Sequence, residues 1–421
     1  MPIPDLPTLD HHDEDSMLSR KFGREVANYL SGSPLNRLSF LRTEHDFLQS
    51  AFSHPSAAFL LMNNLGPLTK DDPTHLAFAT NADVVPLTGA TPFAKTEADL
   101  INDYDSRETH PVILFLGLDD KHRLPSHDAA PAAPAGTEPF AYRTYKGVPY
   151  FAVDVTARGE NAEAANAVIA AMKAKGFTFQ DSSPRHMALH AGQAAMYGQA
   201  RALLDWNARN PFCAQCGQPT LSVHAGTKRV CPPTDKASGT PQPRAPCATR
   251  GTVSNLSFPR TDPTVIMAVV SADGTRILLG RQKRWPKDWY STLAGFQEPG
   301  ESIEEAVRRE VWEESGVTVG RVVLHSSQPW PFPASLMIGA VAQALPGDGE
   351  TIFLGNDAEL ESAKWFPLAE VEEALVKGVS NLGEKAPEGH VEGNLRLPPQ
   401  TAIANRLITA VVEGWGAAPK I

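Results

Sequence analysis

The segment from Gly295 to Val317, GFQEPGESIEEAVRREVWEESGV, restricts the fold more than any other part of this sequence. Ser302 and Glu305 have the spacing of a capping box, in which two residues satisfy each other's free backbone amides where a helix begins. Gly316 is placed to end that helix, because glycine readily adopts the left-handed conformation that follows many helices. The segment is therefore predicted to form a loop, a helix and a second loop.

The predicted helix carries carboxylates on its apolar face. With Ile303 at zero on a wheel of about 100° per residue, three apolar side chains fall within roughly 80° of it: Ala306, Val307 and Val311. Glu310 and Glu314 fall within roughly 20° of Ile303, in the middle of this stripe, and Glu313 lies at its edge. A helix with a solvated acidic face is the alternative, and the stripe disfavours it. Because buried carboxylates take up protons or bind a cation, the cluster predicts Mg²⁺ or Mn²⁺ held by oxygen atoms.

The same segment fills every fixed position of the pattern G-x5-E-x7-R-E-U-x-E-E-x-G-U, where U is aliphatic. These positions are Gly295, Glu301, Arg309, Glu310, Val311, Glu313, Glu314, Gly316 and Val317. The pattern resembles the Nudix box of enzymes that hydrolyse a nucleoside diphosphate linked to another group. The resemblance implies an α/β fold, the Nudix α/β/α sandwich with a mixed sheet.

The chemistry of a diphosphate linkage explains the need for an acidic cluster. Its negative charge must be neutralised before water attacks phosphorus, and divalent ions do this while lowering the pKa of bound water. Glu310 and Glu314, one helical turn apart, are the predicted principal ligands. The resemblance adds the backbone carbonyl of Ala294 and the carboxylate of Glu359. Glu313 either binds a further ion or accepts the proton of the attacking water.

A proline-rich run, SQPWPFPAS, follows the box. Prolines at alternate positions fix φ and remove donors, which predicts a stiff extended loop presenting Trp330 and Phe332. Their faces suit a base or a nicotinamide ring, whereas a loop that only fills the core is the alternative. After a complete box, the run resembles the signature of the NADH pyrophosphatase branch of the Nudix family. The resemblance implies substrate contacts from Gln328, Pro329, Trp330, Pro331, Phe332, Pro333, Ala334 and Ser335.

Further substrate contacts are implied by the same resemblance. They are Phe258, Ala294, Gly295, Phe296 and Ala404. Phe258 stands where relatives often have tyrosine, so a contact that depends on a hydroxyl is lost there. Arg309 and Glu301 are expected to orient the acidic residues of the box rather than to touch the substrate.

All four cysteines fall in one short stretch, at Cys213, Cys216, Cys231 and Cys247. The spacing of the first pair is that of a zinc knuckle, and the other two complete a four-thiolate set. Zinc is favoured over disulfides because nothing else in the sequence indicates an oxidising compartment. Four thiolates leave no open position on the metal, so the predicted role is structural. A long proline-rich insertion before Cys247 departs from the tight bacterial spacing and resembles fungal members.

Length and composition indicate a folded chain of several domains. It has 421 residues, of which 42% are hydrophobic, and a net charge of −10 that argues against a surface coating nucleic acid. No apolar run approaches the roughly 20 residues that span a bilayer. We expect a disordered tail at 1–20, a Nudix-like α/β domain at 21–205, a zinc ribbon at 206–256 and the catalytic domain at 257–421.

Runs of apolar and β-branched residues between turn residues predict the strands. They are Pro111–Leu118, Tyr150–Val155, Val265–Ser271, Arg276–Arg281, Ser291–Phe296, Ile338–Ala344 and Ala363–Phe366. Further helices are predicted at Ala162–Lys175, His186–Asn210 and Thr401–Val412. His186 and His190 could share a helix face, but Met187 replaces the glutamate of a metalloprotease motif, so they are predicted to be surface or packing residues. Residues 121–138 are predicted to form a surface loop or a disordered segment.

The sequence contains no G-x-G-x-x-G fingerprint, which agrees with NAD being a substrate rather than a cofactor. The prediction is metal-dependent hydrolysis of NADH and NAD⁺ to nicotinamide mononucleotide and AMP. The branch resemblance adds removal of NAD caps from RNA and a homodimer. The run SQPWPFPAS disfavours a Nudix hydrolase of ADP-ribose or diadenosine polyphosphates. Retention of Glu310, Glu313 and Glu314 disfavours a non-catalytic zinc-ribbon binding protein.

Sequence signals for cellular location are weak. The acidic N-terminus does not have the pattern of a signal peptide, so the cytosol is the default expectation. The C-terminal Pro-Lys-Ile departs from the peroxisomal Ser-Lys-Leu at two of three positions, and therefore indicates a peroxisomal location only weakly.

Overall fold

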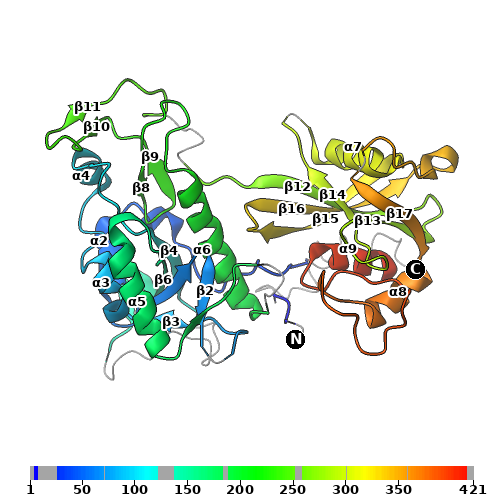
Figure 1. The fold of residues 1–421 in the computed structure, drawn as a ribbon, viewed down its shortest axis with the longest axis horizontal. Helices are drawn as coiled ribbons and strands as arrows, with labels where there is room; N and C mark the ends of the chain where they lie inside the picture. The colour runs from blue at the N-terminus through cyan, green and yellow to red at the C-terminus, as the bar shows by residue number, and fades with distance from the viewer. Residues whose placement is uncertain are drawn as a thin grey trace. The chain divides into compact units, whose positions relative to one another are not determined.

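The computed structural model describes residues 4–7, 26–70, 72–121, 137–183, 188–251, 258–299, 301–357 and 359–414. The chain forms two compact units (Figure 1). The first contains Met1–Asp5, Ser33–Arg260 and Pro331–Ala334, and the second contains Leu6–Gly32, Thr261–Trp330 and Ser335–Ile421. Within the described ranges, no helix is both long enough and apolar enough to cross a bilayer.

The first unit is built on a mixed sheet of seven strands in the order β4-β6-β1-β2-β7, with β3 beside β1 and β5 beside β6. The strands are β1 Ala58–Asn63, β2 Gly66–Thr69, β3 Phe78–Ala79, β4 Ile113–Asp119, β5 Phe140–Tyr142, β6 Tyr145–Asp154 and β7 Thr178–Phe179. The helices are α2 His45–Ser53, α3 Asn81–Thr88, α4 Glu97–Asn102, α5 Ala162–Ala174 and α6 Ala191–Arg209. Its core is a cluster of phenylalanine rings that pack edge to face or stacked: Phe47, Phe52, Phe59, Phe115 and Phe151. The structure confirms the strands predicted near Pro111 and Tyr150 and the helix predicted from Ala162.

Helix α6 begins later than the sequence predicted. Its first residue is Ala191, and His190 is the residue before it, in an extended conformation. Asp5 accepts a hydrogen bond from the backbone amide of Ala191 at 3.0 Å, so a carboxylate at the far N-terminus satisfies one free amide of this helix. His190 stacks on His75, with ring centroids 4.4 Å apart, and therefore has a packing role.

The tail and the predicted loop fall largely outside the described residues. Only residues 4–7 of the predicted tail 1–20 are described, and among them the Asp5 carboxylate accepts a hydrogen bond at the start of α6. The predicted loop at 121–138 is described only at 121, 137 and 138, and His186 and the C-terminal Pro-Lys-Ile are not described.

The second unit is an α/β/α sandwich. Its mixed sheet has the order β15-β16-β12-β13-β17, with β14 paired to β12, and β12 runs parallel to β16. The strands are β12 Asp262–Val270, β13 Arg276–Gln282, β14 Leu293–Phe296, β15 Val319–Trp330, β16 Ser335–Ala344 and β17 Leu360–Pro367. Its helices are α7 Ile303–Ser315, α8 Leu368–Lys377 and α9 Ile403–Val412.

Strand β12 explains why this sheet is covered on both faces. Its side chains are apolar at consecutive positions and point alternately to opposite sides. Val265, Met267 and Val269 pack in the core that contains Val307 and Val311 of α7. Ile266 and Ala268 pack in the other core, with residues of α8 and α9 such as Val371 and Leu407. The predicted sandwich is confirmed.

Two elements of this unit were not predicted, β15 and α8. The run SQPWPFPAS is also not an extended loop: Gln328–Trp330 end β15, Ser335 begins β16, and Pro331–Ala334 form the turn between them. A mixed polar and apolar pattern along β15, with proline at 329, hid the strand from the sequence analysis.

Candidate functional site

Helix α7 begins and ends where the sequence predicted. The Ser302 hydroxyl accepts from the Glu305 amide at 3.2 Å, and the Ser302 amide donates to the Glu305 carboxylate at 2.7 Å. Gly316 ends the helix in the left-handed conformation, with φ at 74°. The capping box and the terminal glycine therefore fix where α7 begins and ends, and its buried Ala306, Val307 and Val311 turn one face toward the sheet.

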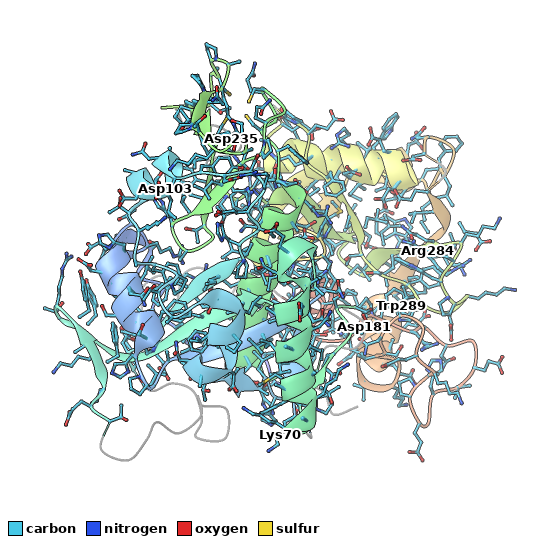
Figure 2. The ribbon with its side chains drawn as sticks, turned by 60° about the vertical axis from the view of Figure 1, so that its left-hand side comes forward. Lys70, Asp103, Asp181, Asp235, Arg284 and Trp289 are labelled. Carbon is cyan, nitrogen blue, oxygen red and sulfur yellow. The ribbon has the colours of Figure 1, made fainter. Side chains whose placement is uncertain are left out.

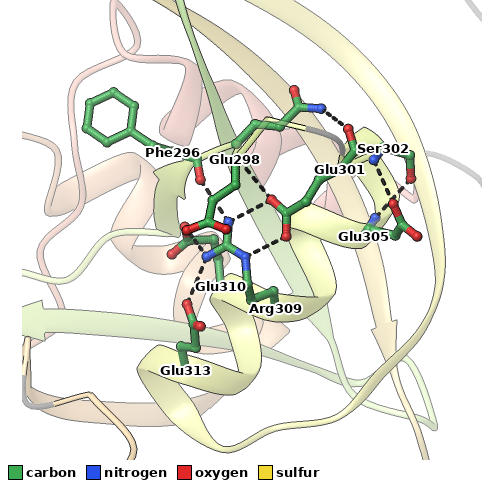
Figure 3. A network of polar contacts seen from close by, with 9 residues as sticks. Phe296, Glu298, Glu301, Ser302, Glu305, Arg309, Glu310 and Glu313 are labelled. Carbon is green, nitrogen blue, oxygen red and sulfur yellow. Dashed lines mark hydrogen bonds and ion pairs between the residues drawn. The ribbon is translucent and has the colours of Figure 1, made fainter.

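Arg309 holds the acidic residues of the box in place (Figure 3). Its Nε and Nη2 donate to the two oxygens of Glu301 at 2.6 and 2.9 Å. Its Nη1 donates to Glu310 at 2.9 Å and to Glu313 at 2.8 Å, and Nη2 also donates to the Phe296 carbonyl at 2.8 Å. The hydrogen bonds from Arg309, with one from the Glu298 amide, lower the pKa of Glu301 to about 2. Arg309 therefore contacts three carboxylates at once, and the orienting role of Arg309 and Glu301 stays a prediction.

Glu310 and Glu314 face inward, as the wheel predicted. Glu314 is 4% exposed. The side chain of Glu310 is 12% exposed and that of Glu313 is 38% exposed, so Glu313 lies at the edge. Burial, followed by the charges of Glu359 and Glu310, raises the pKa of Glu314 to about 9. Burial also raises the pKa of Glu310, against the opposing effect of Arg309. Carboxylates in this state favour either a proton or a cation.

Gly295 is needed because the Glu310 carboxylate packs against the backbone of β14. A Cβ atom at this position would lie 2.0 Å from the carboxyl carbon of Glu310, far inside any allowed contact. The sequence analysis assigned Gly295 to substrate binding, whereas its observed contact is with this predicted metal ligand.

The carbonyl of Ala294 points away from β12. The Gln297 amide donates to the Pro263 carbonyl at 3.0 Å, so 263 and 297 form a hydrogen-bonded pair of the antiparallel ladder. Such pairs alternate, which makes Ile266 and Ala294 a non-hydrogen-bonded pair whose backbone groups face outward. The Ala294 amide accordingly lies on the side of Glu314 and lowers the pKa of its carboxyl. The carbonyl of the same residue therefore lies on the side of the acidic cluster.

Two further carboxylates contribute charge to this cluster. Glu359, predicted as a ligand, is exposed and accepts from Gln282 at 2.7 Å, and its charge raises the pKa of Glu310 and Glu314. Asp357 also raises the pKa of Glu314, and its amide donates to the Glu313 carbonyl at 3.1 Å. Asp357 was missed, although its position two residues before Glu359 in an acidic loop was an available signal.

The ligand atoms of the acidic cluster are more widely spaced than those of a closed metal site. Among the described residues, only the cysteines bring three or more such atoms within 4.8 Å of one another. Arg309 instead binds one oxygen of Glu310 and one of Glu313. The chemistry of the donor set still fits a hard divalent ion, because it combines several carboxylates with an outward-facing backbone carbonyl.

A surface hollow of about 580 Å³ adjoins the box loop. It is lined by Asp262, Pro263, Phe296, Gln297, Glu298, Pro299 and Glu301. The Phe296 ring is 61% exposed, so an aromatic face is available beside the acidic residues. The substrate contact at Phe296 stays a prediction.

The remaining predicted substrate residues differ in exposure. Phe258 is 48% exposed, Trp330 is half-buried, and Ser335 and Ala404 are buried, the latter as the second residue of α9. Gln328 is 1% exposed and its amide is hydrogen-bonded within the protein.

The turn Pro331–Ala334 packs against α6 in the first unit. Arg201, which is 8% exposed, donates from Nε to the Pro331 carbonyl at 2.7 Å. Its guanidinium lies over the Phe332 ring, 4.5 Å from the centroid. Arg201 was not predicted, because a single arginine within a helix has no distinctive sequence signal.

The four cysteines converge in the first unit. Their sulfurs all lie within 4.8 Å of one another, with 3.6 Å between Cys213 and Cys247 and between Cys216 and Cys231. Four sulfurs bonded to one zinc ion lie about 3.8 Å apart, whereas a disulfide is about 2.05 Å long. Burial raises the pKa of Cys213, but hydrogen bonds from Thr249 and from the backbone outweigh it and lower this pKa to about 6. The site fits zinc, and it includes Cys247.

The insertion before Cys247 connects the ribbon to α4 and the loop after it. The ribbon strands are β8 Leu221–Val223 and β9 Lys228–Val230, and the insertion forms β10 Thr234–Asp235 and β11 Gln242–Pro243. Lys236 pairs with Asp103 at 2.8 Å, and Asp235 accepts from the Ser106 amide at 3.0 Å. Asp103 and Asp235 are labelled in Figure 2. Arg244 binds Asp235 at 2.7 Å. The insertion therefore joins the ribbon to the end of α4 and the loop after it, and does not form a free loop.

Comparison with known families matches all three predicted parts. A model described as the NUDIX domain matches residues 260–385, and one described as an NADH pyrophosphatase-like rudimentary NUDIX domain matches residues 56–206. The NADH pyrophosphatase zinc ribbon domain matches residues 208–238, which ends before Cys247.

Curated relatives match over most of the chain. The NAD-capped RNA hydrolase of Schizosaccharomyces pombe is 33% identical over 395 residues, which cover 92% of this chain and 94% of that protein. Human NAD-capped RNA hydrolase NUDT12 is 34% identical over 386 residues, which cover 91% of this chain and 73% of that protein. Human mitochondrial NAD(P)H pyrophosphatase NUDT13 is 39% identical over 226 residues, which cover 53% of this chain and 56% of that protein. The chain belongs to the Nudix family, in the branch that joins a rudimentary Nudix domain and a zinc ribbon to a Nudix hydrolase domain.

Proposed function

We propose that this chain is a metal-dependent NAD(H) diphosphatase that hydrolyses NADH and NAD⁺ to the nicotinamide mononucleotide and AMP. The observation that carries the proposal is the inward-facing acidic cluster of α7, in which burial and like charge raise the pKa of Glu314 to about 9. A buried carboxylate in such surroundings is stabilised by a divalent cation, and that cation neutralises the diphosphate. The names of the relatives, NAD(P)H pyrophosphatase and NAD-capped RNA hydrolase, support the dinucleotide as the substrate class.

The residues of the cluster are proposed to have different roles. Glu310, Glu314 and the Ala294 carbonyl would hold Mg²⁺ or Mn²⁺, with Glu359 as a further ligand from the loop before β17. When bound, the ions neutralise the phosphate oxygens and lower the pKa of water. Arg309 keeps the carboxylates of Glu310 and Glu313 oriented. Glu313, which is more exposed than Glu310 and Glu314, is placed either to accept a proton from water or to bind a further ion.

Removal of NAD caps from RNA is a second proposed activity. Two of the relatives described above are named for it. An NAD cap presents the same diphosphate as free NAD, so the acidic cluster serves both substrates. The zinc ribbon is proposed to have a structural role, and the homodimer expected from the family remains a proposal.

The proposed function is tested by incubating the purified chain with NADH, NAD⁺, ADP-ribose and NAD-capped RNA, with and without Mg²⁺ or Mn²⁺. Chromatography should show reduced nicotinamide mononucleotide and AMP from NADH, and nicotinamide mononucleotide and AMP from NAD⁺, only when a divalent ion is present. Glu310→Gln should abolish this turnover and leave the zinc content and melting temperature unchanged. Faster hydrolysis of ADP-ribose would favour the other Nudix substrate class. Turnover that survives Glu310→Gln would contradict the mechanism.

A further inference from the structure

A short N-terminal segment, residues 26–32, belongs to the second unit and not to the Nudix-like domain that follows it in sequence. We call this segment the N-terminal strap. Asn28 and Tyr29 within it are 1% and 3% exposed. The boundary predicted at residue 21 therefore differs from the compact units, which place the strap with the catalytic domain. A buried asparagine side chain is costly unless its amide is paired, so the contacts of Asn28 indicate what the strap does.

Asn28 binds the strand that carries the substrate motif. Its Nδ2 donates to the Ser326 hydroxyl at 2.9 Å and to the Ser327 carbonyl at 2.9 Å. These are the two residues that immediately precede Gln328. The strap is thus hydrogen-bonded to β15 at the start of SQPWPFPAS, almost 300 residues further along the chain.

Gln328 completes a three-way connection. Its Nε2 donates to the Tyr29 carbonyl and to the Thr401 carbonyl, each at 2.9 Å, and its Oε1 accepts from the Ile403 amide at 2.9 Å. Both amide hydrogens are used, and the side chain is 1% exposed. A direct contact between this amide and a substrate would have to break these bonds. Gln328 instead joins the strap, β15 and the first turn of α9, which contains Ala404.

We propose that the strap is a positioning element for the substrate-binding segment, and that Gln328 acts through it rather than by touching the substrate. Asn28 and Gln328 are then positioning residues that fix where the end of β15 and the start of α9 lie. This inference rests on the proposed function, because the segment that they position is the proposed dinucleotide contact.

Asn28→Ala distinguishes a positioning role of Gln328 from direct contact with the substrate. Asn28 contacts β15 but is not part of the substrate motif, so its loss can affect only the positioning. The loss of two hydrogen bonds should raise the KM for NADH by about tenfold and change kcat by less than about threefold. Gln328→Met should have a similar effect, and the double variant should be less than additive because both act on one network. Gln343→Met is the matched control: this exposed glutamine on β16 makes one bond, to the Ala272 carbonyl, and its loss should leave KM unchanged.

Hydrogen–deuterium exchange of the substrate-free full-length chain gives a readout that does not depend on activity. Asn28→Ala should increase exchange in peptides covering 323–330 and 401–407, and leave those covering α7 unchanged. If Asn28→Ala increases exchange in these peptides but the wild-type chain does not hydrolyse NADH, the proposed function fails while the positioning role stands. Should Asn28→Ala not fold, Ser326→Ala removes one of the two bonds and should give a smaller change of the same kind.

Two results would overturn the proposal. One is an Asn28→Ala protein with wild-type KM and wild-type exchange at 323–330, whatever its melting temperature. The other is that Gln328→Met raises KM while Asn28→Ala does not, so that the double variant has the same KM as Gln328→Met alone. That second result would assign Gln328 to the substrate.

Discussion

At the scale of single residues, Gly295 shows how one missing side chain shapes the site. Gly295→Ala would place a Cβ 2.0 Å from the Glu310 carboxyl carbon, so the carboxylate must move while the fold is kept. A displacement of about 1 Å at a metal ligand should lower kcat/KM by on the order of 100-fold. Steady-state kinetics with NADH tests this. Gly192→Ala, where the new atom meets Pro34 at an ordinary 3.6 Å, should have no effect.

Glu314 gives a pH dependence whose sign is set by its raised pKa. The ordinary glutamate value near 4.3 applies to the unfolded chain and about 9 to the folded chain, so the folded state binds more protons between these values. Without Mg²⁺ or Mn²⁺, this residue should therefore make the protein less stable as pH rises from about 5 to 9.

Melting temperatures across this pH range test that sign. Glu314→Gln should flatten the fall seen in wild type without added Mg²⁺ or Mn²⁺, and added Mg²⁺ should flatten it in wild type. A fall of equal size in both proteins would show that Glu314 does not titrate in this way.

At the scale of elements, the end of α7 depends on Gly316. Its φ is 74°, and an added Cβ would lie 2.8–3.0 Å from atoms of Phe353, two of them backbone. Gly316→Ala should lower the free energy of unfolding by about 2 kcal/mol, which urea denaturation can measure. Gly176→Ala separates the strain of a positive φ from the clash with Phe353. Gly176 also has a positive φ, of 83°, but an added Cβ would have nothing within 4 Å. Equal losses in the two variants would rule out the clash with Phe353.

The elements also show what sequence patterns could predict. The capping box, the apolar stripe of α7 and the continuous apolar run of β12 are local signals, and the structure confirmed all three. Strand β15 was missed because proline and polar residues interrupt its alternation, and its pairing with β16 supplies what the sequence pattern lacks. The start of α6 was predicted too early, because the residue that caps it, Asp5, comes from the other end of the domain.

At the scale of the whole molecule, contacts between segments far apart in the chain could not be predicted from sequence patterns. Asn28 and Arg201 contact predicted residues, yet neither of them has a motif of its own. The zinc centre is the opposite case, because cysteine is so rare in this chain that the ligand set was visible before the fold. The structure places Cys247 in the cluster, as the sequence predicted, despite the long insertion.

Cys247→Ser tests whether the fourth thiol completes the zinc centre. Elemental analysis should find about one zinc ion per wild-type chain and clearly less in the variant, because a serine hydroxyl is a poor replacement for a thiolate. The ribbon should also melt at a lower temperature, since metal binding and folding are coupled. An unchanged zinc content would leave only three cysteine ligands. Cys216→Ser serves as the positive control.

The central claim is that the carboxylates on the inner face of α7 hold divalent ions against the diphosphate. The most direct measurement is an anomalous difference map at the manganese edge, from crystals of the full chain soaked with Mn²⁺ and AMP. The account predicts manganese roughly 2 Å from oxygens of Glu310 and Glu314 and in contact with the AMP phosphate. Manganese and phosphate bound together elsewhere, with both carboxylates still held only by protein groups, would contradict it.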